Sequence, residues 1–173
     1  APIMFGLDGM NQAAYAAGQP IPNIIGMAFS YSMTIAVLYP AFALAVLIFS
    51  KSNQLKTVGK ISIAPAFFGI SEPLMFGVPV VMNPFMAIPW IISPTVNVLL
   101  GWLACSSGLV ARYAGVTVFN FPMGVTGILN GSFTIAILEV VVCIIDVLIF
   151  MPFVRIQDKK YIDAEKAAET EQN

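Results

Sequence analysis

The chain has 173 residues, of which 58% are hydrophobic and only 10% are charged, and its formal net charge is −1. A soluble domain of this length needs more polar surface than this composition supplies. Nucleic acid is excluded as a partner, because the chain has no basic face to neutralise phosphates. The composition therefore predicts an all-α membrane protein whose partner is a lipid bilayer.

Metal and redox chemistry have no obvious ligands in this sequence. It contains no histidine, and Cys105 and Cys143 lie in apolar stretches without the spacing of a metal or redox motif. We interpret both cysteines as small buried residues. No metal and no other cofactor is therefore expected.

The first predicted membrane span covers residues 24–49, which are apolar and long enough to cross a bilayer, with Pro40 as a predicted kink. Residues 51–60 follow as a short loop that carries three lysines. Because short cytoplasmic loops are rich in lysine and arginine, this loop is predicted to lie in the cytoplasm.

Two further spans are predicted at residues 85–110 and 125–150. A basic stretch after residue 155 places the end of the third span in the cytoplasm as well. The charged residues 158–173 are expected to form a solvated, partly helical cytoplasmic tail. Residues 1–157 are then the membrane domain.

A broken apolar segment, residues 61–83, separates the lysine loop from the second span. The loop and the basic end lie on one side, so an even number of crossings must separate them, yet three apolar stretches lie between. Each half of the broken segment is roughly ten residues, about 15 Å of helix against a hydrocarbon core of ~30 Å. We therefore predict that residues 61–83 form a re-entrant helical hairpin that reaches the midplane.

The predicted turn of this hairpin reads Gly69-Ile70-Ser71-Glu72-Pro73. Gly69 permits the first arm to end, and Pro73 fits the first position of a second arm. Glu72 precedes a proline and is pushed out of helical dihedrals. Ser71 or Glu72 is therefore expected at the N-cap, where backbone N–H groups and the positive end of the helix dipole face it.

The turn is a candidate substrate site. Transporters hold substrates with the ends of broken helices near the midplane, and an ionisable side chain at that depth is costly and marks function. We therefore predict that Ser71 and Glu72 bind substrate. The alternative is that Glu72 only caps the second arm or pairs with a cation elsewhere in the protein.

Four more polar residues require an interpretation. Asn83 follows the second arm and is a candidate substrate contact, with a turn as the alternative. Glu139 and Asp146 are seven residues apart, so they share one face of the last span. Buried acids in a span can mark function, but we favour the alternative of a structural hydrogen bond or a helix-end contact at the dimer or domain interface. Asp8 lies between two glycines and predicts a turn.

Five stretches taken in order carry a family resemblance: NQAAYAAGQPIPNI at 11–24, FSKSNQLKTVGK at 49–60, FGISEPLMFGVPVVMNP at 68–84, IPWIISPTVN at 88–97 and DVLIFMPFVRIQDKK at 146–160. They resemble the lactose/cellobiose/diacetylchitobiose family of membrane sugar permeases. These proteins are the enzyme IIC components of the phosphoenolpyruvate-dependent phosphotransferase system. The match corresponds to the C-terminal part of the family's membrane domain.

The resemblance implies a homodimer in a bacterial plasma membrane that binds a β-linked disaccharide near the midplane. A separate cytoplasmic subunit, enzyme IIB, carries a phosphocysteine that phosphorylates the 6-hydroxyl of the imported sugar. By this resemblance Glu72 is the carboxylate that binds the sugar and helps to deprotonate the attacking hydroxyl. It is then both the catalytic and a substrate-binding residue.

This sequence departs from the family at two places. Ser71 stands where the family has asparagine, and the family's Gly-Gly-Ser-Gly stretch reads Phe29-Ser30-Tyr31-Ser32. The family's essential histidine lies in a first hairpin, which we expect upstream of Ala1, so the segment alone should not transport. Composition and hairpin also fit a secondary sugar transporter or facilitator without phosphorylation, or a membrane fragment that does not transport.

Overall fold

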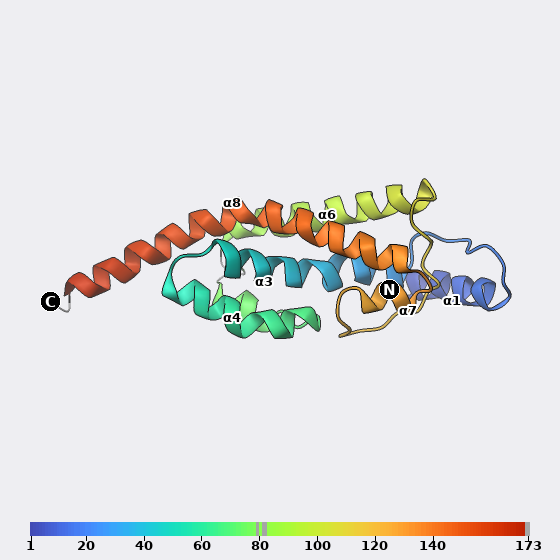
Figure 1. The fold of residues 1–173 in the computed structure, drawn as a ribbon, viewed down its shortest axis with the longest axis horizontal. Coiled ribbons are helices and arrows are strands. Elements are labelled where there is room, and N and C mark those ends of the chain that lie inside the picture. The colour runs from blue at the N-terminus through green and yellow to red at the C-terminus, as the bar shows by residue number, and fades with distance from the viewer. Residues whose placement is uncertain (79, 81–82, 172–173) are drawn as a thin grey trace.

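The computed structural model of the protein describes residues 1–78, 80 and 83–171, and all regular secondary structure within these residues is helical (Figure 1). The helices are α1 (Pro2–Ala16), α2 (Met27–Tyr31), the π-helix η1 (Ser32–Ala36), α3 (Val37–Phe49), α4 (Asn53–Phe67), α5 (Glu72–Gly77), α6 (Pro84–Ser106), α7 (Val125–Leu129) and α8 (Phe133–Glu171). Among the described residues, three stretches are long and apolar enough to cross a membrane: Met27–Phe49, Pro84–Ser106 and Phe133–Thr170. The predicted all-α membrane fold is confirmed.

The first of these stretches forms the centre of the molecule. It is built from α2, η1 and α3 without a break, and α3 packs against both α4 and α8 (Figure 1). Pro40 has no N–H to donate to the carbonyl of Ala36, and the π-helical turn ends at that residue. The irregular helical hydrogen bonding therefore lies in the turn before Pro40, and the helix continues past the proline.

The predicted lysine loop is wrong over most of its length. Ser52 is the N-cap of α4 and accepts a hydrogen bond from the Leu55 N–H at 3.4 Å, so Lys56 and Lys60 lie on the helix rather than in a loop. The polar residues of this stretch are typical of a loop, but a good N-cap lets them form the first turns of a helix. The first arm is consequently 15 residues long, or about 22 Å.

The helical hairpin itself lies where the sequence predicts it. The chain turns between the end of α4 at Phe67 and the start of α5 at Glu72, and α5 packs back against α4. The second arm is shorter than expected, because α5 has only six residues. Part of the predicted second arm, residues 79 and 81–82, lies outside the described residues. Re-entry into a membrane stays a prediction.

One end of the bundle joins three segments that the parity argument places on the same side. Asp158 of α8 accepts hydrogen bonds from the N–H groups of Lys51, at 2.7 Å, and Ser52, at 2.9 Å. Asn83, at the start of α6, donates to the Gln157 side chain at 2.9 Å. Both ends of the hairpin therefore meet α8 at one place. Between Asn83 and Asp158, the chain leaves this end of the bundle along α6 and returns to it along α8. The side of the membrane stays a prediction.

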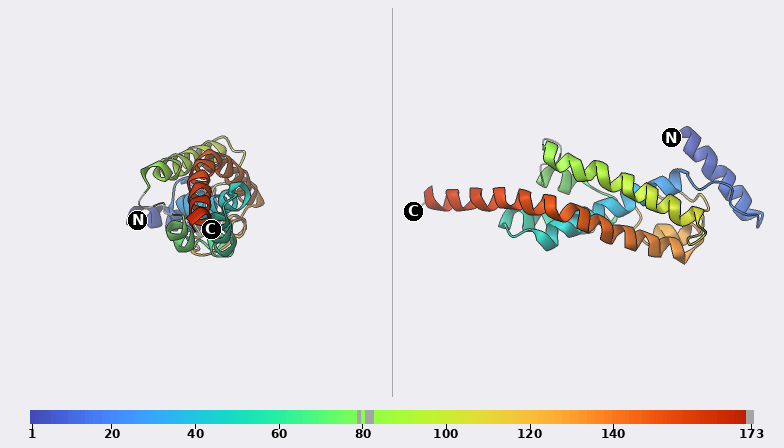
Figure 2. Two further views of the ribbon diagram at one scale, coloured as in Figure 1. Left: turned by 90° about the vertical axis from the view of Figure 1, so that its left-hand side faces the viewer. Right: turned by 90° about the horizontal axis from the view of Figure 1, so that it is seen from above.

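The last predicted span differs from the structure at both ends. Residues 125–150 contain the short helix α7, a break at Asn130-Gly131-Ser132 and then α8, which continues for 39 residues (Figure 2). The tail from residue 158 is part of α8, which agrees with the helix predicted for part of it, but its first residue, Asp158, is buried rather than solvated. Ala, Glu and Lys are strong helix formers, which explains why the helix persists past its apolar part.

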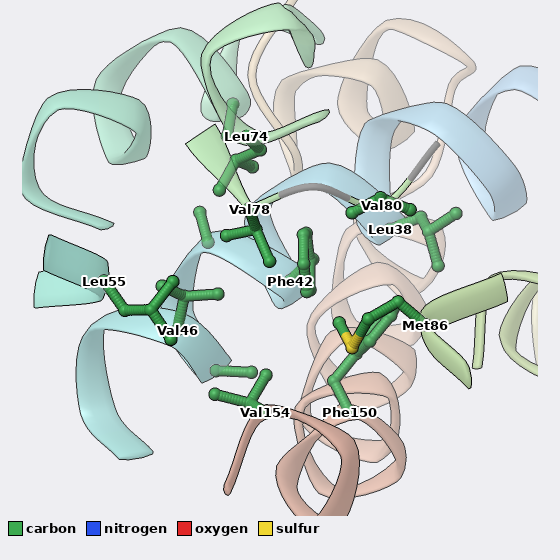
Figure 3. Close-up of a cluster of buried hydrophobic side chains, with 13 residues drawn as sticks. Leu38, Phe42, Val46, Leu55, Leu74, Val78, Val80, Met86, Phe150 and Val154 are labelled. Carbon is green, nitrogen blue, oxygen red and sulfur yellow. The ribbon is translucent and has the colours of Figure 1, made fainter. Parts of the chain in front are cut away.

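Close packing joins the hairpin to the rest of the bundle. A glycine, Gly59, sits where α4 crosses α3, and a Cβ there would lie 3.1 Å from the Cα of Leu47, so only a small residue permits this approach. Figure 3 shows a buried cluster in which side chains of the hairpin point toward α3 and α8. Its labelled members are Leu38, Phe42, Val46, Leu55, Leu74, Val78, Val80, Met86, Phe150 and Val154.

Candidate functional site

The hairpin tip carries Glu72 with its side chain exposed. Ser71 occupies the N-cap of α5, as one of the two predicted alternatives, but its side chain makes no capping hydrogen bond. Glu72 is the first residue of α5 and Pro73 the second. The Glu72 side chain is exposed, and within the part of the chain that the structure describes it has no hydrogen-bond partner and no cation paired with it. The carboxylate is therefore free to receive a ligand.

The tip rests on an aromatic residue from the first span. Gly69 adopts φ +73°, and a Cβ at this position would lie 2.9 Å from the hydroxyl oxygen of Tyr31. The Tyr31 hydroxyl oxygen also accepts a hydrogen bond from the Asn120 N–H at 2.8 Å, and its ring meets Phe119 edge to face at 5.1 Å. The hairpin, the first span and the loop after α6 therefore converge at the tip.

Sequence reasoning missed Asn120 and Phe119 altogether. In the sequence, Tyr31 is distinguished only by its place in a stretch that departs from the family's glycine-rich pattern. Asn120 has φ +58°, a left-handed conformation that is uncommon for residues other than glycine. The local sequence of the loop does not predict its contact with the tip, because Tyr31 and Asn120 are 89 residues apart.

A buried carboxylate holds the elements behind the tip together. Glu139 of α8 is fully buried and accepts three hydrogen bonds: from the Ser32 hydroxyl at 2.5 Å, the Thr126 hydroxyl at 2.6 Å and the Gly124 N–H at 2.6 Å. Ser32 follows Tyr31 directly and begins the π-helix. Glu139 thus fixes the π-helix and α7 to α8, as the structural interpretation predicted.

Tyr113 extends this network. Its hydroxyl lies 2.9 Å from the Ser32 hydroxyl. Burial, together with the nearby Glu139 carboxylate, raises the pKa of the Tyr113 phenol well above its ordinary value, so the phenol keeps its proton. Because the Ser32 hydroxyl donates its proton to Glu139, it accepts the hydrogen bond from the Tyr113 hydroxyl. The chain Tyr113–Ser32–Glu139 is therefore a directed series of hydrogen bonds.

The remaining predicted polar residues serve the fold. Asp146 is fully buried and accepts a hydrogen bond from the Asn97 amide at 2.7 Å, which joins α8 to α6 as the structural interpretation predicted. The turn predicted around Asp8 is wrong, because this residue lies inside α1. Its buried carboxylate accepts hydrogen bonds from the Ala28 N–H at 2.9 Å and the Thr117 hydroxyl at 2.7 Å. Asp8 thus caps α2 from a neighbouring helix.

Asn83 is not part of the tip. Its side-chain oxygen accepts a hydrogen bond from the Phe85 N–H at 3.1 Å, which makes it the N-cap of α6. Its amide nitrogen donates to Gln157 at 2.9 Å. Both polar atoms are thus engaged at the end of the hairpin opposite Ser71 and Glu72.

These features define a class: a helical membrane protein with a helical hairpin whose tip carries an accessible carboxylate and packs against an aromatic residue of the first span. A family model described as Phosphotransferase system, EIIC matches residues 1–94. The chain therefore belongs to the EIIC family of the phosphotransferase system, which confirms the resemblance seen in the sequence.

Known proteins agree with this membership. The oligo-beta-mannoside-specific EIIC component of Bacillus subtilis (strain 168) is 37% identical over 171 residues, which are 95% of this chain and 39% of that protein. The cellobiose-specific EIIC component of Geobacillus stearothermophilus is 40% identical over 133 residues, 75% of this chain and 30% of that protein.

A solved structure is also similar. The crystal structure of the transporter ChbC, the IIC component from the N,N'-diacetylchitobiose-specific phosphotransferase system, matches with a TM-score of 0.90 and 36% identity. The match covers 96% of this chain and 40% of that chain. This chain therefore spans at most two fifths of the length of these proteins.

Proposed function

We propose that this chain is part of a phosphotransferase-system permease that binds a β-linked disaccharide and moves it across a bacterial plasma membrane as it is phosphorylated. The observation that carries the proposal is the exposed, unpaired carboxylate of Glu72 at the hairpin tip. A carboxylate accepts hydrogen bonds from sugar hydroxyls. Ser71, which is half-buried beside it, supplies a second polar contact.

Glu72 is also the proposed general base. The sugar's 6-hydroxyl attacks the phosphorus of the phosphocysteine on enzyme IIB, the bond between sulfur and phosphorus breaks, and the thiolate leaves. The proton of the hydroxyl passes to the Glu72 carboxylate, which must lie within hydrogen-bond reach of it. Phosphoryl transfer depends mainly on the positioning of the reacting groups, so the fixed tip is suited to this role.

The substrate class is proposed from the relatives. Relatives are named for cellobiose, oligo-beta-mannoside and diacetylchitobiose, which are β-linked sugars, and a protein named as a lactose-specific EIICB component from Lacticaseibacillus casei is 33% identical. The name EIICB supports enzyme IIB as the partner of this chain. We leave Asn83 outside the sugar site, because both of its polar atoms hold α6 and α8.

The proposed assembly follows the family. It is a homodimer, with residues 51–60 and the C-terminal end in the cytoplasm, where enzyme IIB reaches the sugar. Both ends of the hairpin contact α8 at or next to Asp158, which supports placing these segments on the same side of the membrane. A secondary transporter or a fragment that does not transport is the alternative, and the experiment below separates them.

The test uses the full-length protein that contains this chain, in membrane vesicles with the soluble phosphotransferase components. We expect phosphoenolpyruvate-dependent formation of 6-phosphorylated disaccharide, and a loss of about 100-fold or more in Glu72→Gln, the usual scale for a general base. Asp163→Asn, a change at an exposed carboxylate of α8, is the matched control and should retain full activity.

Two results would contradict the proposal. Unchanged phosphorylation in Glu72→Gln would remove Glu72 from the catalytic role. Uptake of unmodified sugar without phosphoenolpyruvate would instead favour a secondary transporter.

A further inference from the structure

A cavity of about 480 Å³ opens at the junction of α3 and α8, away from the hairpin tip. Three cationic side chains line it: Lys51, which follows α3, and Arg155 and Lys159 on α8. Arg155 and Lys159 are four residues apart, so they lie on one face of the helix. All three side chains are exposed, and their charges face a single space.

No acidic side chain in the described part of the chain forms an ion pair with these cations. Asp158 also lines the cavity, but its two oxygens accept hydrogen bonds from the N–H groups of Lys51 and Ser52. Its carboxylate is buried, and its hydrogen bonds go to the backbone at the start of α4. The Arg155 guanidinium is held in place over the Phe49 ring, 5.2 Å from its centre. The cavity therefore has an unbalanced positive charge and one preorganised cation.

The remaining walls are apolar. Ile48, Phe49 and Ile162 line the cavity, and Ile48 is 60% exposed. Phe49 is the last residue of a stretch long enough to span a membrane. On α8, the apolar run ends at Val154, directly before Arg155. A ligand held here therefore has its anionic group beside the cations and an apolar portion beside Ile48, at the level where a span leaves the hydrocarbon core.

We propose that this cavity binds the headgroup of an anionic phospholipid, with the phosphate between Lys51, Arg155 and Lys159 and the first part of an acyl chain along Ile48. Guanidinium and ammonium groups both bind phosphate, and basic pockets between helices at the membrane surface recognise anionic headgroups. A free phosphate ion would use the cations but not the apolar wall. The lipid uses both, so the observations favour it.

The test is native mass spectrometry of the full-length protein in detergent, titrated with phosphatidylglycerol or with phosphatidylcholine. We expect selective retention of phosphatidylglycerol. Replacing all three cations, as Lys51→Gln, Arg155→Gln and Lys159→Gln together, should weaken its binding on the order of 100-fold, since each cation near a membrane surface contributes about a 5-fold change. Lys159→Gln alone, a change at an exposed side chain that should not affect folding, should weaken it about 5-fold.

A matched control separates a specific site from general charge attraction. Lys56→Gln, Lys60→Gln and Lys160→Gln together remove the same charge from positions outside the cavity and should leave phosphatidylglycerol binding unchanged. Equal weakening in this control would overturn the proposal, and so would equal retention of phosphatidylcholine or unchanged binding in Lys159→Gln. Displacement of the lipid by an equimolar amount of inorganic phosphate would show a soluble phosphate site instead.

Discussion

Replacing Glu139 with alanine should destabilise the protein strongly, whereas glutamine should be tolerated. Glu139 is fully buried and accepts hydrogen bonds from Ser32, Thr126 and the Gly124 N–H. In Glu139→Ala the two hydroxyls can turn toward other acceptors, but the Gly124 N–H cannot. An orphaned buried N–H costs about 1–3 kcal/mol.

The other losses add to this value. Two charge-assisted hydrogen bonds are lost and only partly replaced, at roughly 1 kcal/mol each. One methylene group also vanishes from a packed site, at about 0.8 kcal/mol. With about 2 kcal/mol for the orphaned N–H, the sum is about 5 kcal/mol, a large part of the roughly 5–15 kcal/mol that stabilises a typical domain.

Glutamine preserves the pattern of hydrogen bonds. Its oxygen can accept from the Gly124 N–H, while its amide group donates to the hydroxyls of Ser32 and Thr126, which reverse their direction. The loss of charge assistance is offset because a neutral side chain costs less to bury. We therefore expect Glu139→Gln to cost about 1 kcal/mol.

The measurement is the midpoint of thermal unfolding of the full-length protein in detergent, followed through the reactivity of buried thiols such as Cys105 and Cys143. At about 1–2 °C per kcal/mol for a chain longer than 250 residues, alanine should lower the midpoint by about 5–10 °C and glutamine by about 1–2 °C. If both variants unfold at the same temperature as the unchanged protein, Glu139 does not hold these elements together. If glutamine is as harmful as alanine, the charge rather than the hydrogen-bond pattern is what matters.

Two further predictions concern the hairpin, and the same unfolding assay checks both. Gly69→Ala should cost about 1–2 kcal/mol for the left-handed backbone, plus the displacement of the Tyr31 hydroxyl. In a Tyr31→Phe background, where the hydroxyl is absent and the Asn120 N–H has already lost its acceptor, the same change should cost only the backbone part. No cost of Gly69→Ala in that background would refute the backbone contribution. Asp158→Ala should cost about 2–4 kcal/mol, because the N–H groups of Lys51 and Ser52 lose their acceptor. A loss below half a degree would show that water replaces the carboxylate.

The position of the hairpin could be predicted because its signals are local. Gly69 and Pro73 restrict the backbone where they stand, and the apolar arms on either side are visible in the sequence. The count of crossings needed only the placement of positive charges. These signals located the reversal, although α4 begins several residues before the predicted first arm.

The errors in the sequence analysis share a physical cause. Asp8 lies between glycines and was interpreted as a turn, but its carboxylate is bound by Ala28 and Thr117, and these contacts favour a helix there. Asp158 was assigned to a solvated tail, but it is buried by contacts more than 100 residues away in the chain. Tertiary contacts of this range leave no pattern in the local sequence and override local propensity.

The depth of Glu72 follows from where the hairpin is anchored. The polar residues 53–60 form about 12 Å of the first arm. On the proposed topology, this part of the arm lies at the level of the lipid headgroups. The apolar residues 61–67 add about 10 Å, which places the tip well inside a hydrocarbon core of ~30 Å. The base is fixed to α8 by Asp158 and the tip meets the first span at Tyr31. A shift of α8 along the first span would pull the base of the hairpin away from the contact of its tip with Tyr31, so the position of Glu72 depends on both helices and not on the turn alone.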